Sequence, residues 1–317
     1  MKREVILGID TSNYTTSVAI MGTDGELIAN IKRPLPVKPG ERGLRQSDAV
    51  FAHIKNIPSA MQEARSYLGD ATVVAVGVSE RPRNVDGSYM PCFLTGVAVA
   101  ESVASTTGAP IYRFSHQCGH IMAALYSSGR TDLLEKEFCA FHVSGGTTEV
   151  LRVNKSGAAF SAELVGGTAD INAGQLIDRV GVHMGLPFPA GAHMEKLALE
   201  NDTKIPSIKL RVSDRKVNLS GAENQAIGLF DKTADPRLTS AYVLNYVTKA
   251  LSLLASAYEE SFGSTEFVFA GGVMSNSIIK SALSKQFNAS FATPACSADN
   301  AVGIACLAMR AYNSENK

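Results

Sequence analysis

Two histidines in the segment Ser-His-Gln-Cys-Gly-His have a type and a spacing that suit metal binding. His116 and His120 are four residues apart, so on a helix both imidazoles would lie on one face, close enough to share one ion. Two ligands do not complete a site, and such pairs also arise as coincidences of packing. Asp299, at the start of the last helix, would supply the missing ligand, since two nitrogens and a hard oxygen suit Zn²⁺ or Fe²⁺. Cys118 and Cys296 are alternative ligands.

The same motif argues against proteolysis. His-Gln-Cys-Gly-His lacks the glutamate that acts as general base in the His-Glu-x-x-His motif of zinc peptidases. The remaining histidines have no comparable neighbours, and we expect them to be structural or surface residues: His53, His142, His183 and His193.

Two polar turns are candidates for binding a phosphate. The first covers residues 10–16 (DTSNYTT) and the second covers residues 144–148 (SGGTT). Such turns expose backbone N–H groups and hydroxyls with no large side chain in the way. Each could also be an ordinary hairpin turn, because Ser, Thr, Asn and Gly are common in all turns. Facing each other across a cleft, the turns would hold the phosphates of one nucleotide, with Asp10 placed to hold a cation or water and Ser12 as a second catalytic candidate.

A third glycine-rich segment, residues 270–276 (AGGVMSN), follows the apolar run FVFA and opens a predicted helix. Gly271 and Gly272 would let a flat ring or a ribose approach the backbone, and a helix N-terminus favours anions. A close crossing of a helix and a strand would need the same small residues. We interpret the segment as a nucleotide contact.

The elements that position these residues form a repeated unit. From Val5 to Lys32 the chain alternates apolar runs with polar turns, which predicts three antiparallel strands, and the same order recurs from Cys139. Apolar residues near helical spacing predict further helices, at residues 48–68, 96–107, 172–184, 239–262 and 275–287. Buried strands are predicted from Thr72, Pro110 and Phe267. This alternation indicates an α/β protein with two similar halves.

Composition sets the limits on size and partners. With 317 residues, 45% of them hydrophobic and 19% charged, the chain can bury a large core and should form two lobes. We place them at residues 1–133 and 134–298, with the C-terminal helix, residues 299–317, packing back on the first lobe. Thirty basic residues balance 30 acidic ones, which argues against strong unassisted binding of a phosphate backbone.

Cysteine usage and hydropathy bear on the compartment. The 5 cysteines are an odd number, widely spaced and without a CxxC pair, so neither a disulfide framework nor a cysteine zinc site is indicated. The N-terminal segment lacks the apolar region of a secretory signal, and no run approaches the roughly 20 apolar residues of a membrane span. We expect a cytoplasmic protein without a membrane partner.

Six motifs follow one another in a fixed order across nearly the whole chain: IDTSNYTTSVAI, SHQCGHI, HVSGGTTEV, NAGQLIDRVGVHMGLPFPAG, FAGGVMSN and ADNAVGIA. In this order they resemble the tRNA N6-adenosine threonylcarbamoyltransferase family, formerly described as sialoglycoprotein endopeptidases. The resemblance implies a duplicated actin-like fold of the ASKHA, ribonuclease H-like type, with two lobes and a nucleotide cleft between them. It also implies transfer of threonylcarbamoyl from its mixed anhydride with AMP to N6 of adenosine 37 in tRNAs that read ANN codons.

The resemblance assigns roles to positions of this chain. Its metal ligands fall on His116, His120 and Asp299, and one Fe²⁺ or Zn²⁺ is implied, with Mg²⁺ as a further ion that accompanies nucleotides. Its phosphate loop and remaining ligand positions, with Asp178 on the ribose, fall on Val143, Ser144, Gly145, Gly146, Thr147, Asp178, Gly191 and Asn276. The implied partners are an adenine nucleotide or threonylcarbamoyl-AMP, and tRNA held through partner proteins of the modification complex.

The chain departs from the family pattern in several loops. The first loop of the family usually reads Glu-Thr-Ser-Cys-Asp-Glu-Thr, and its acidic pair is replaced here by Tyr14 and Thr15. Cys118 replaces the glutamate of the histidine motif, and Thr147 stands where His or Asn is usual. A family loop with Gly-Pro-Gly is replaced by residues 81–87 (RPRNVDG), which changes a wall of the cleft. We interpret these changes as the mark of a divergent paralogue.

Three functions remain open from the sequence. The first is the family transferase with altered auxiliary residues. The second is a carbamoyl-type transferase or nucleotide hydrolase that acts on another acceptor, which the lost acidic pair favours. The third is a non-catalytic binding or assembly subunit of the modification machinery, which the altered first loop favours and the three retained metal positions disfavour.

Overall fold

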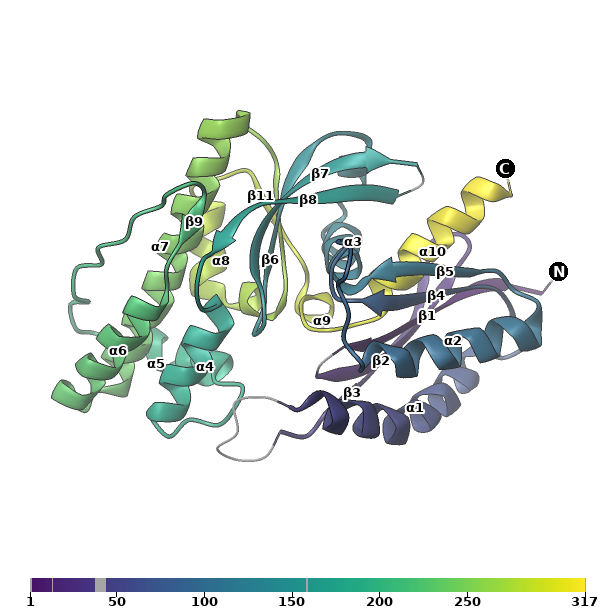
Figure 1. Ribbon diagram of the computed structural model, residues 1–317, viewed down its shortest axis with the longest axis horizontal. Helices are drawn as coiled ribbons and strands as arrows, with labels where there is room; N and C mark the ends of the chain where they lie inside the picture. The colour runs from purple at the N-terminus through teal and green to yellow at the C-terminus, as the bar shows by residue number, and fades with distance from the viewer. Residues whose placement is uncertain (1, 13, 38–43, 158, 317) are drawn as a thin grey trace.

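The structure is a computed structural model that describes residues 2–12, 14–37, 44–157 and 159–316. Asn13 of the first polar turn therefore lies outside the described residues. Two sheets with their helices form two lobes, which lie side by side along the longest axis of the molecule (Figure 1). We call them the first lobe and the second lobe in chain order.

The sheet of the first lobe has the strand order β3-β2-β1-β4-β5. Strands β1, β2 and β3 form an antiparallel meander, and β4 and β5 continue the sheet in parallel with β1. Their bounds are Glu4–Ser12, Thr15–Gly22, Leu27–Pro34, Thr72–Arg81 and Ile111–Ser115. β1 and β2 are buried along almost their whole length, as their continuous apolar runs predict.

The sheet of the second lobe repeats this arrangement, in the order β11-β10-β6-β7-β8-β9. Again three strands, β6 to β8, form an antiparallel meander, and β10 and β11 lie parallel to β6. The strands span Phe138–Val143, Thr148–Ser156, Ala159–Thr168, Lys216–Val217, Phe267–Ala270 and Ala289–Phe291 for β6 to β11. The predicted duplication is therefore confirmed at the level of strand order and direction.

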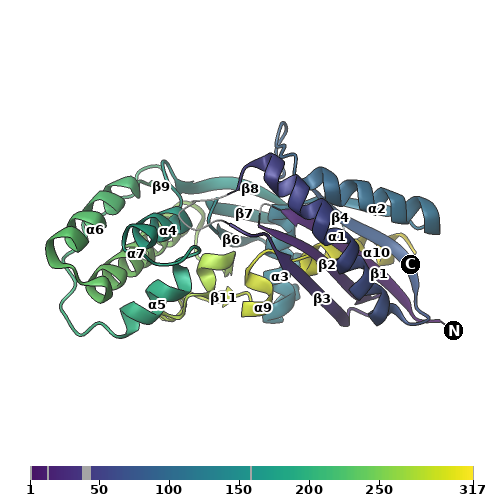
Figure 2. The same cartoon turned by 90° about the horizontal axis from the view of Figure 1, so that it is seen from below.

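Helices cover both sheets, and α3 lies between them (Figures 1 and 2). Helices α1 and α2 pack side by side on one face of the first sheet, and α10 packs on strands β1, β2, β4 and β5. Helix α3 contacts strands of both sheets. The bounds of these four are Gln46–Leu68 for α1, Phe93–Thr107 for α2, His116–Ser128 for α3 and Val302–Glu315 for α10.

The second lobe holds the remaining helices. The longest, α7, begins after Asp235, whose side chain accepts hydrogen bonds from the N–H groups of Arg237 and Leu238, as expected of a capping residue. The helices span Ala173–His183 (α4), Gly191–Leu199 (α5), Ser220–Thr233 (α6), Pro236–Phe262 (α7), Ser277–Ser284 (α8) and Pro294–Ser297 (α9), with short 3₁₀ helices η1 at Thr131–Glu135 and η2 at Gly272–Ser275. Among the described residues, no helix combines the length and the hydropathy that a membrane crossing requires.

The contact between α3 and α10 fixes two distant parts of the chain against each other. A Cβ on Gly303 would overlap the carbonyl oxygen of Gly119 and would lie 2.7 Å from the backbone nitrogen of Ala123. Only glycine at this position lets the two helices approach so closely. The start of α10 is therefore held beside the first turns of α3, which is where the histidine pair lies.

Candidate metal and nucleotide site

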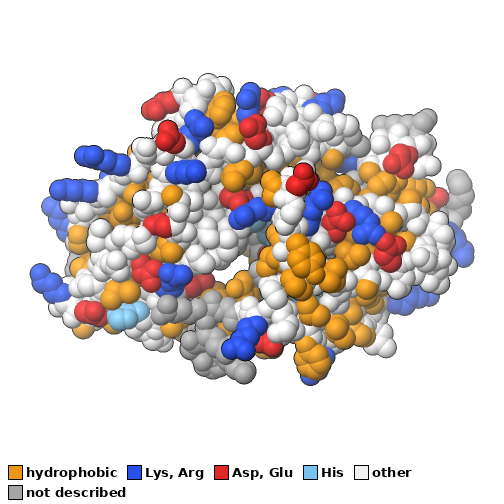
Figure 3. Space-filling view, in the orientation of Figure 1, with side chains coloured by type: hydrophobic (Ala, Val, Ile, Leu, Met, Phe, Trp, Pro, Cys, Tyr) orange, Lys and Arg blue, Asp and Glu red, His pale blue; other side chains and the backbone are white. Residues whose placement is uncertain are grey.

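A cavity of about 1110 Å³ lies between the two lobes, and the space-filling view shows a hollow between them (Figure 3). The first lobe contributes the turn after β1, the loop that follows β4 and the start of α3. The second lobe contributes the turn after β6, helix α4 and η2. Binding sites for one small ligand usually measure about 300 to 1,000 Å³. The cleft is therefore large enough for a nucleotide together with part of a second reactant.

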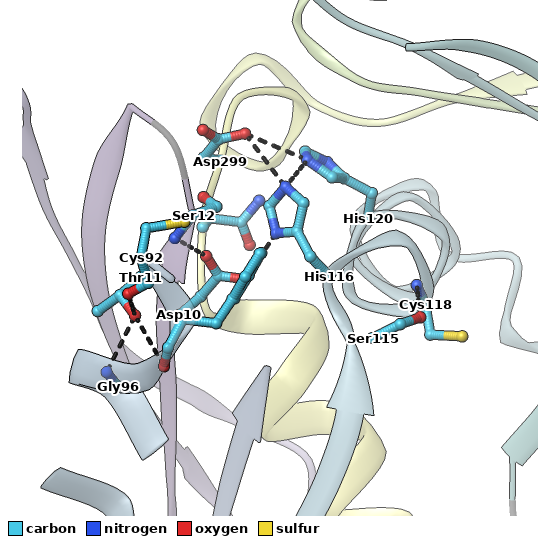
Figure 4. Close-up of polar contacts among 12 residues, drawn as sticks. Asp10, Thr11, Ser12, Cys92, Gly96, Ser115, His116, Cys118, His120 and Asp299 are labelled. Carbon is cyan, nitrogen blue, oxygen red and sulfur yellow. Dashed lines mark hydrogen bonds and ion pairs between the residues drawn. The ribbon is translucent and has the colours of Figure 1, made fainter. Parts of the chain in front are cut away.

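Three side chains converge at the edge of this cleft (Figure 4). Nε2 of His116 lies 3.0 Å from Nε2 of His120. Oδ1 of Asp299 lies 3.2 Å from Nε2 of His120 and 3.5 Å from Nε2 of His116. Ligands about 2.1 Å from one ion, at angles of about 90° to 110°, lie about 3.0 to 3.4 Å apart. The spacing of the three donor atoms thus fits a single metal ion.

Local structure explains why the donors meet. Ser115 caps α3, because its hydroxyl accepts from the N–H of Cys118, so the helix begins at His116 and both histidines lie within its first turns. Asp299 lies in the short segment between α9 and α10. The close contact of Gly303 with Gly119 holds this segment beside α3.

Asp10 lies behind the histidine pair. Its side chain is completely buried at the end of β1, and Oδ2 lies 2.7 Å from Nδ1 of His116. The other oxygen, Oδ1, accepts a hydrogen bond of 3.0 Å from the N–H of Ser12. A carboxylate bonded to the far nitrogen of an imidazole keeps the proton there and leaves Nε2 free as a ligand. Asp10 therefore orients His116.

The charges of the cluster would favour a bound cation. Burial opposes a charge on His116, but Asp10 and Asp299 outweigh it and raise the pKa of this histidine to about 10. Burial would raise the pKa of Asp299, yet its bonds to the two histidines hold it well below its usual value. The pKa of His120 is lowered by burial and by the neighbouring charge of His116. Without a metal, the proton on His116 offsets only one of the two carboxylate charges, and a divalent cation that displaced this proton would offset both.

His142 is a cleft residue that the sequence did not single out. It lies on β6 and is 4% exposed, and its ring centroid is 4.6 Å from that of His120. Neither ring nitrogen has a hydrogen-bond partner among the described residues, and burial lowers its pKa well below the usual value. Its position two residues before the glycine-rich turn was the available signal in the sequence. The three converging donors do not include it.

The two cysteines considered as alternative ligands lie elsewhere. Cys118 is buried in the core beside α10, and its sulfur points away from the histidines (Figure 4). Cys296 is buried in the same cluster of apolar residues. Neither belongs to the group of converging donors found among the described residues, because the helical spacing that faces both histidines toward the cleft turns position 118 away from it.

The glycine-rich turn between β6 and β7 is held by helix α4. The N–H of Ser144 donates to the carbonyl of Thr147 at 2.8 Å, and Nδ2 of Asn172 donates to the carbonyl of Gly146 at 2.9 Å. A Cβ on Gly174 would lie 2.5 Å from the carbonyl oxygen of Ser144, so the first turn of the helix rests directly on the loop. The N–H groups of a tight turn beside a helix N-terminus form a suitable site for a phosphate.

Most of the residues singled out from the sequence line this one cleft. These are Ser12, His116, Ser144, Gly145, Gly146, Thr147, Asp178, Gly191, Gly272, Asn276 and Asp299. Asp178 lies on α4, where Oδ1 accepts from the N–H of Ala190 at 2.8 Å and burial raises its pKa. The other four lie behind the cleft wall: Asp10, His120, Val143 and Gly271.

Gly271 joins the second sheet to the cleft, and its replacement should destabilise the protein. Its φ is +98°, and a Cβ would overlap the carbonyl oxygen of Val143. We expect Gly271→Ala to lower the free energy of unfolding by about 2–3 kcal/mol. Gly272→Ala is the matched control, because a Cβ there meets no atom within 4 Å, and it should change that free energy by less than about 1 kcal/mol. Denaturant unfolding compares the two; equal effects would contradict the steric explanation.

A family model and individual relatives match this chain under the same family name. The sequence model of a family described as tRNA N6-adenosine threonylcarbamoyltransferase matches residues 38–306. The protein of that name from Streptococcus suis (strain 05ZYH33) is 29% identical over 328 residues, which cover 100% of this chain and 95% of the relative. The one from Bacillus licheniformis is 28% identical over 296 residues, covering 89% and 83%.

Two solved structures share the fold at low sequence identity. Full-length HypF in its phosphate- and nucleotide-bound form is 14% identical, with a TM-score of 0.60 over 98% of this chain and 47% of that one. The activator of 2-hydroxyisocaproyl-CoA dehydratase from Clostridium difficile, with bound ADPNP, is also 14% identical, with a TM-score of 0.57 over 99% and 98%. These likenesses confirm the predicted actin-like fold.

Proposed function

Since the chain belongs to the tRNA N6-adenosine threonylcarbamoyltransferase family, we propose that it is a metal-dependent transferase of threonylcarbamoyl. Its donor is threonylcarbamoyl-AMP, and its acceptor is N6 of adenosine 37 in tRNAs that read ANN codons. The observation that carries the proposal is the convergence of His116, His120 and Asp299 within 3.5 Å in the cleft that also holds the glycine-rich turn.

The side chains of the first cluster would hold and orient a metal ion. His116, His120 and Asp299 would hold one Zn²⁺ or Fe²⁺ ion, which when bound supplies a Lewis acid for a carbonyl or phosphoryl oxygen. Asp10 keeps the first of these histidines in the orientation and tautomer that ligation needs. Two carboxylates, the buried Asp10 and the partly buried Asp299, lie against the histidine pair, which favours a cation there.

The second lobe binds the leaving group. In the reaction the N6 amine forms a bond to the carbamoyl carbon, the bond from that carbon to the phosphate oxygen breaks, and AMP and one proton are released. The N–H of Ser144 is bonded within the turn, and the remaining N–H groups of residues 145–147 would stabilise the phosphate as its charge grows. Asp178 has one oxygen committed to Ala190, and its other oxygen can accept from a ribose hydroxyl. Ser12 has a hydroxyl without a partner among the described residues and can bond the reacting groups.

A transfer assay tests the proposal. Purified protein is incubated with threonylcarbamoyl-AMP and unmodified ANN-decoding tRNA, with and without the partner proteins of the modification complex. Nucleoside mass spectrometry then measures threonylcarbamoyladenosine. We expect the modified nucleoside above the level that the partners give alone, and a requirement for the partners, since 30 basic and 30 acidic residues leave no net charge to attract RNA. Tight binding of AMP without any modified tRNA would show that the acceptor is a different molecule.

A further inference from the structure

An arginine in the loop after β4 is held in the cleft by a buried carboxylate. Nε of Arg83 lies 2.6 Å from Oε1 of Glu149, whose side chain is 8% exposed on β7. The other oxygen, Oε2, accepts a hydrogen bond of 2.5 Å from Nε2 of Gln117. Both carboxylate oxygens are therefore occupied, and the contact joins the first lobe to the second.

The two terminal nitrogens of this guanidinium face the cleft without a protein partner among the described residues. Its side chain is 46% exposed and lines the cleft, and neither Nη1 nor Nη2 has a hydrogen-bond or ion-pair partner among the described residues. Arg130 shows the contrast, because its Nε, Nη1 and Nη2 all donate to oxygens of Asp132, Glu266 or Ser290. A guanidinium fixed through Nε presents its remaining N–H groups in one plane, which matches the geometry of a carboxylate or a phosphate.

The position of Arg83 indicates which anion it would meet. Gln117, the residue that completes the bonds of Glu149, directly follows the metal-site residue His116 in α3. Arg83 and His142 line the same cleft, and the His142 ring lies against that of His120, with 4.6 Å between the ring centroids. The phosphate-binding turn lies in the second lobe. A donor with its phosphate on that turn and its carbamoyl group at the metal cluster would extend its far end toward the loop that carries Arg83.

We propose that Arg83 binds the carboxylate of the threonyl group of the donor, and that Glu149 is the positioning residue that fixes the guanidinium for this contact. The inference rests on the proposed function, because it takes the donor from there. A phosphate of the RNA backbone shares the same chemistry, but its binding would be measured with tRNA rather than with the donor. The site would let the protein select an acyl donor that carries a carboxylate.

Calorimetry with paired ligands tests the inference. One ligand is a non-reactive sulfamoyl analogue of threonylcarbamoyl-AMP, and the second is the same compound built on 1-aminopropan-2-ol, which lacks only the carboxylate. We expect the wild-type protein to bind the first about 10- to 100-fold more tightly. Arg83→Met should abolish this preference while AMP binds as before.

Two further variants test whether Glu149 positions Arg83 and whether the effect is specific to the cleft. Glu149→Gln keeps the shape of the side chain but removes the charge that fixes the guanidinium, so the preference should fall several-fold without vanishing. Arg152→Met is the control, because Arg152 pairs with Glu137 at 2.7 Å and is 35% exposed, in the same strand as Glu149 but outside the cleft lining. It should leave the preference unchanged.

The outcomes are distinguishable. Equal affinity of the wild-type protein for the two analogues, with AMP still bound, would overturn the inference and leave the nucleotide site standing. A loss of tRNA affinity in Arg83→Met with unchanged donor selectivity would overturn it in favour of an RNA phosphate. If the wild-type protein bound neither AMP nor either analogue, the proposed function itself would fail.

Discussion

Replacing His116 with alanine should yield a protein that holds no metal after dialysis and transfers no threonylcarbamoyl. The imidazole supplies one of three converging donors, at 3.0 Å from His120 and 3.5 Å from Asp299. Loss of an outer-sphere partner already lowers metal affinity by about 10- to 100-fold, and loss of a direct ligand should exceed that. Elemental analysis and the transfer assay measure the two effects.

The alanine variant also leaves Asp10 buried without its partner, which by itself destabilises a protein. His116→Asn removes this ambiguity, because its amide N–H can still donate to Asp10 while Nε2 is gone. It should fold as the wild-type protein does and still lack metal. His183→Ala is the control, since that histidine pairs with Asp231 outside the cleft lining. A fully active, metal-free variant would refute the proposed mechanism.

Asp10→Asn should weaken metal binding by about 10- to 100-fold and lower transfer activity at limiting metal, although Asp10 is not a ligand. The amide is neutral, so it no longer favours a positive charge at His116. It can also donate to Nδ1, which would leave the proton on Nε2 and block the ligand atom.

The decisive measurement for this variant is metal affinity by competition with a chelator. Excess metal should restore much of the activity of Asp10→Asn but none of that of His116→Asn, because only the latter has lost a donor atom. Asp24→Asn, at an exposed side chain in the turn between β2 and β3, controls for the loss of one carboxylate. Unchanged metal affinity in Asp10→Asn would show that the carboxylate serves stability alone.

The regular parts of the fold follow from local sequence. The two strand meanders, the helix at residues 48–68 and the strands at Thr72 and Phe267 were predicted because their apolar periodicity is continuous. Helix boundaries were less accurate. The predicted helix at residues 275–287 is a 3₁₀ turn followed by α8, which begins only after Asn276 caps it, and α2 begins three residues before the predicted start, at Phe93.

The site was predictable where chemistry is local and not where it depends on contacts between distant segments. The helical spacing of His116 and His120 predicted that their imidazoles lie side by side, and their Nε2 atoms are 3.0 Å apart. The role of Asp10 as the partner of Nδ1 was missed, because it arises only when β1 is placed against α3. The same holds for Arg83 and Glu149, which meet across the two lobes. Pairings over such sequence separations leave no periodic signal.

The packing of α10 on the first sheet has a consequence for biosynthesis. Residues 302–315 are translated after both sheets, yet they cover strands β1 and β4, whose Ile6 and Ala75 pack against Ala308. Until that segment leaves the ribosome, one face of the first sheet is bare and apolar, which is a state prone to aggregation. Asp299 emerges at the same stage. The three converging side chains can therefore meet only after both sheets and the turn between β6 and β7 have been made.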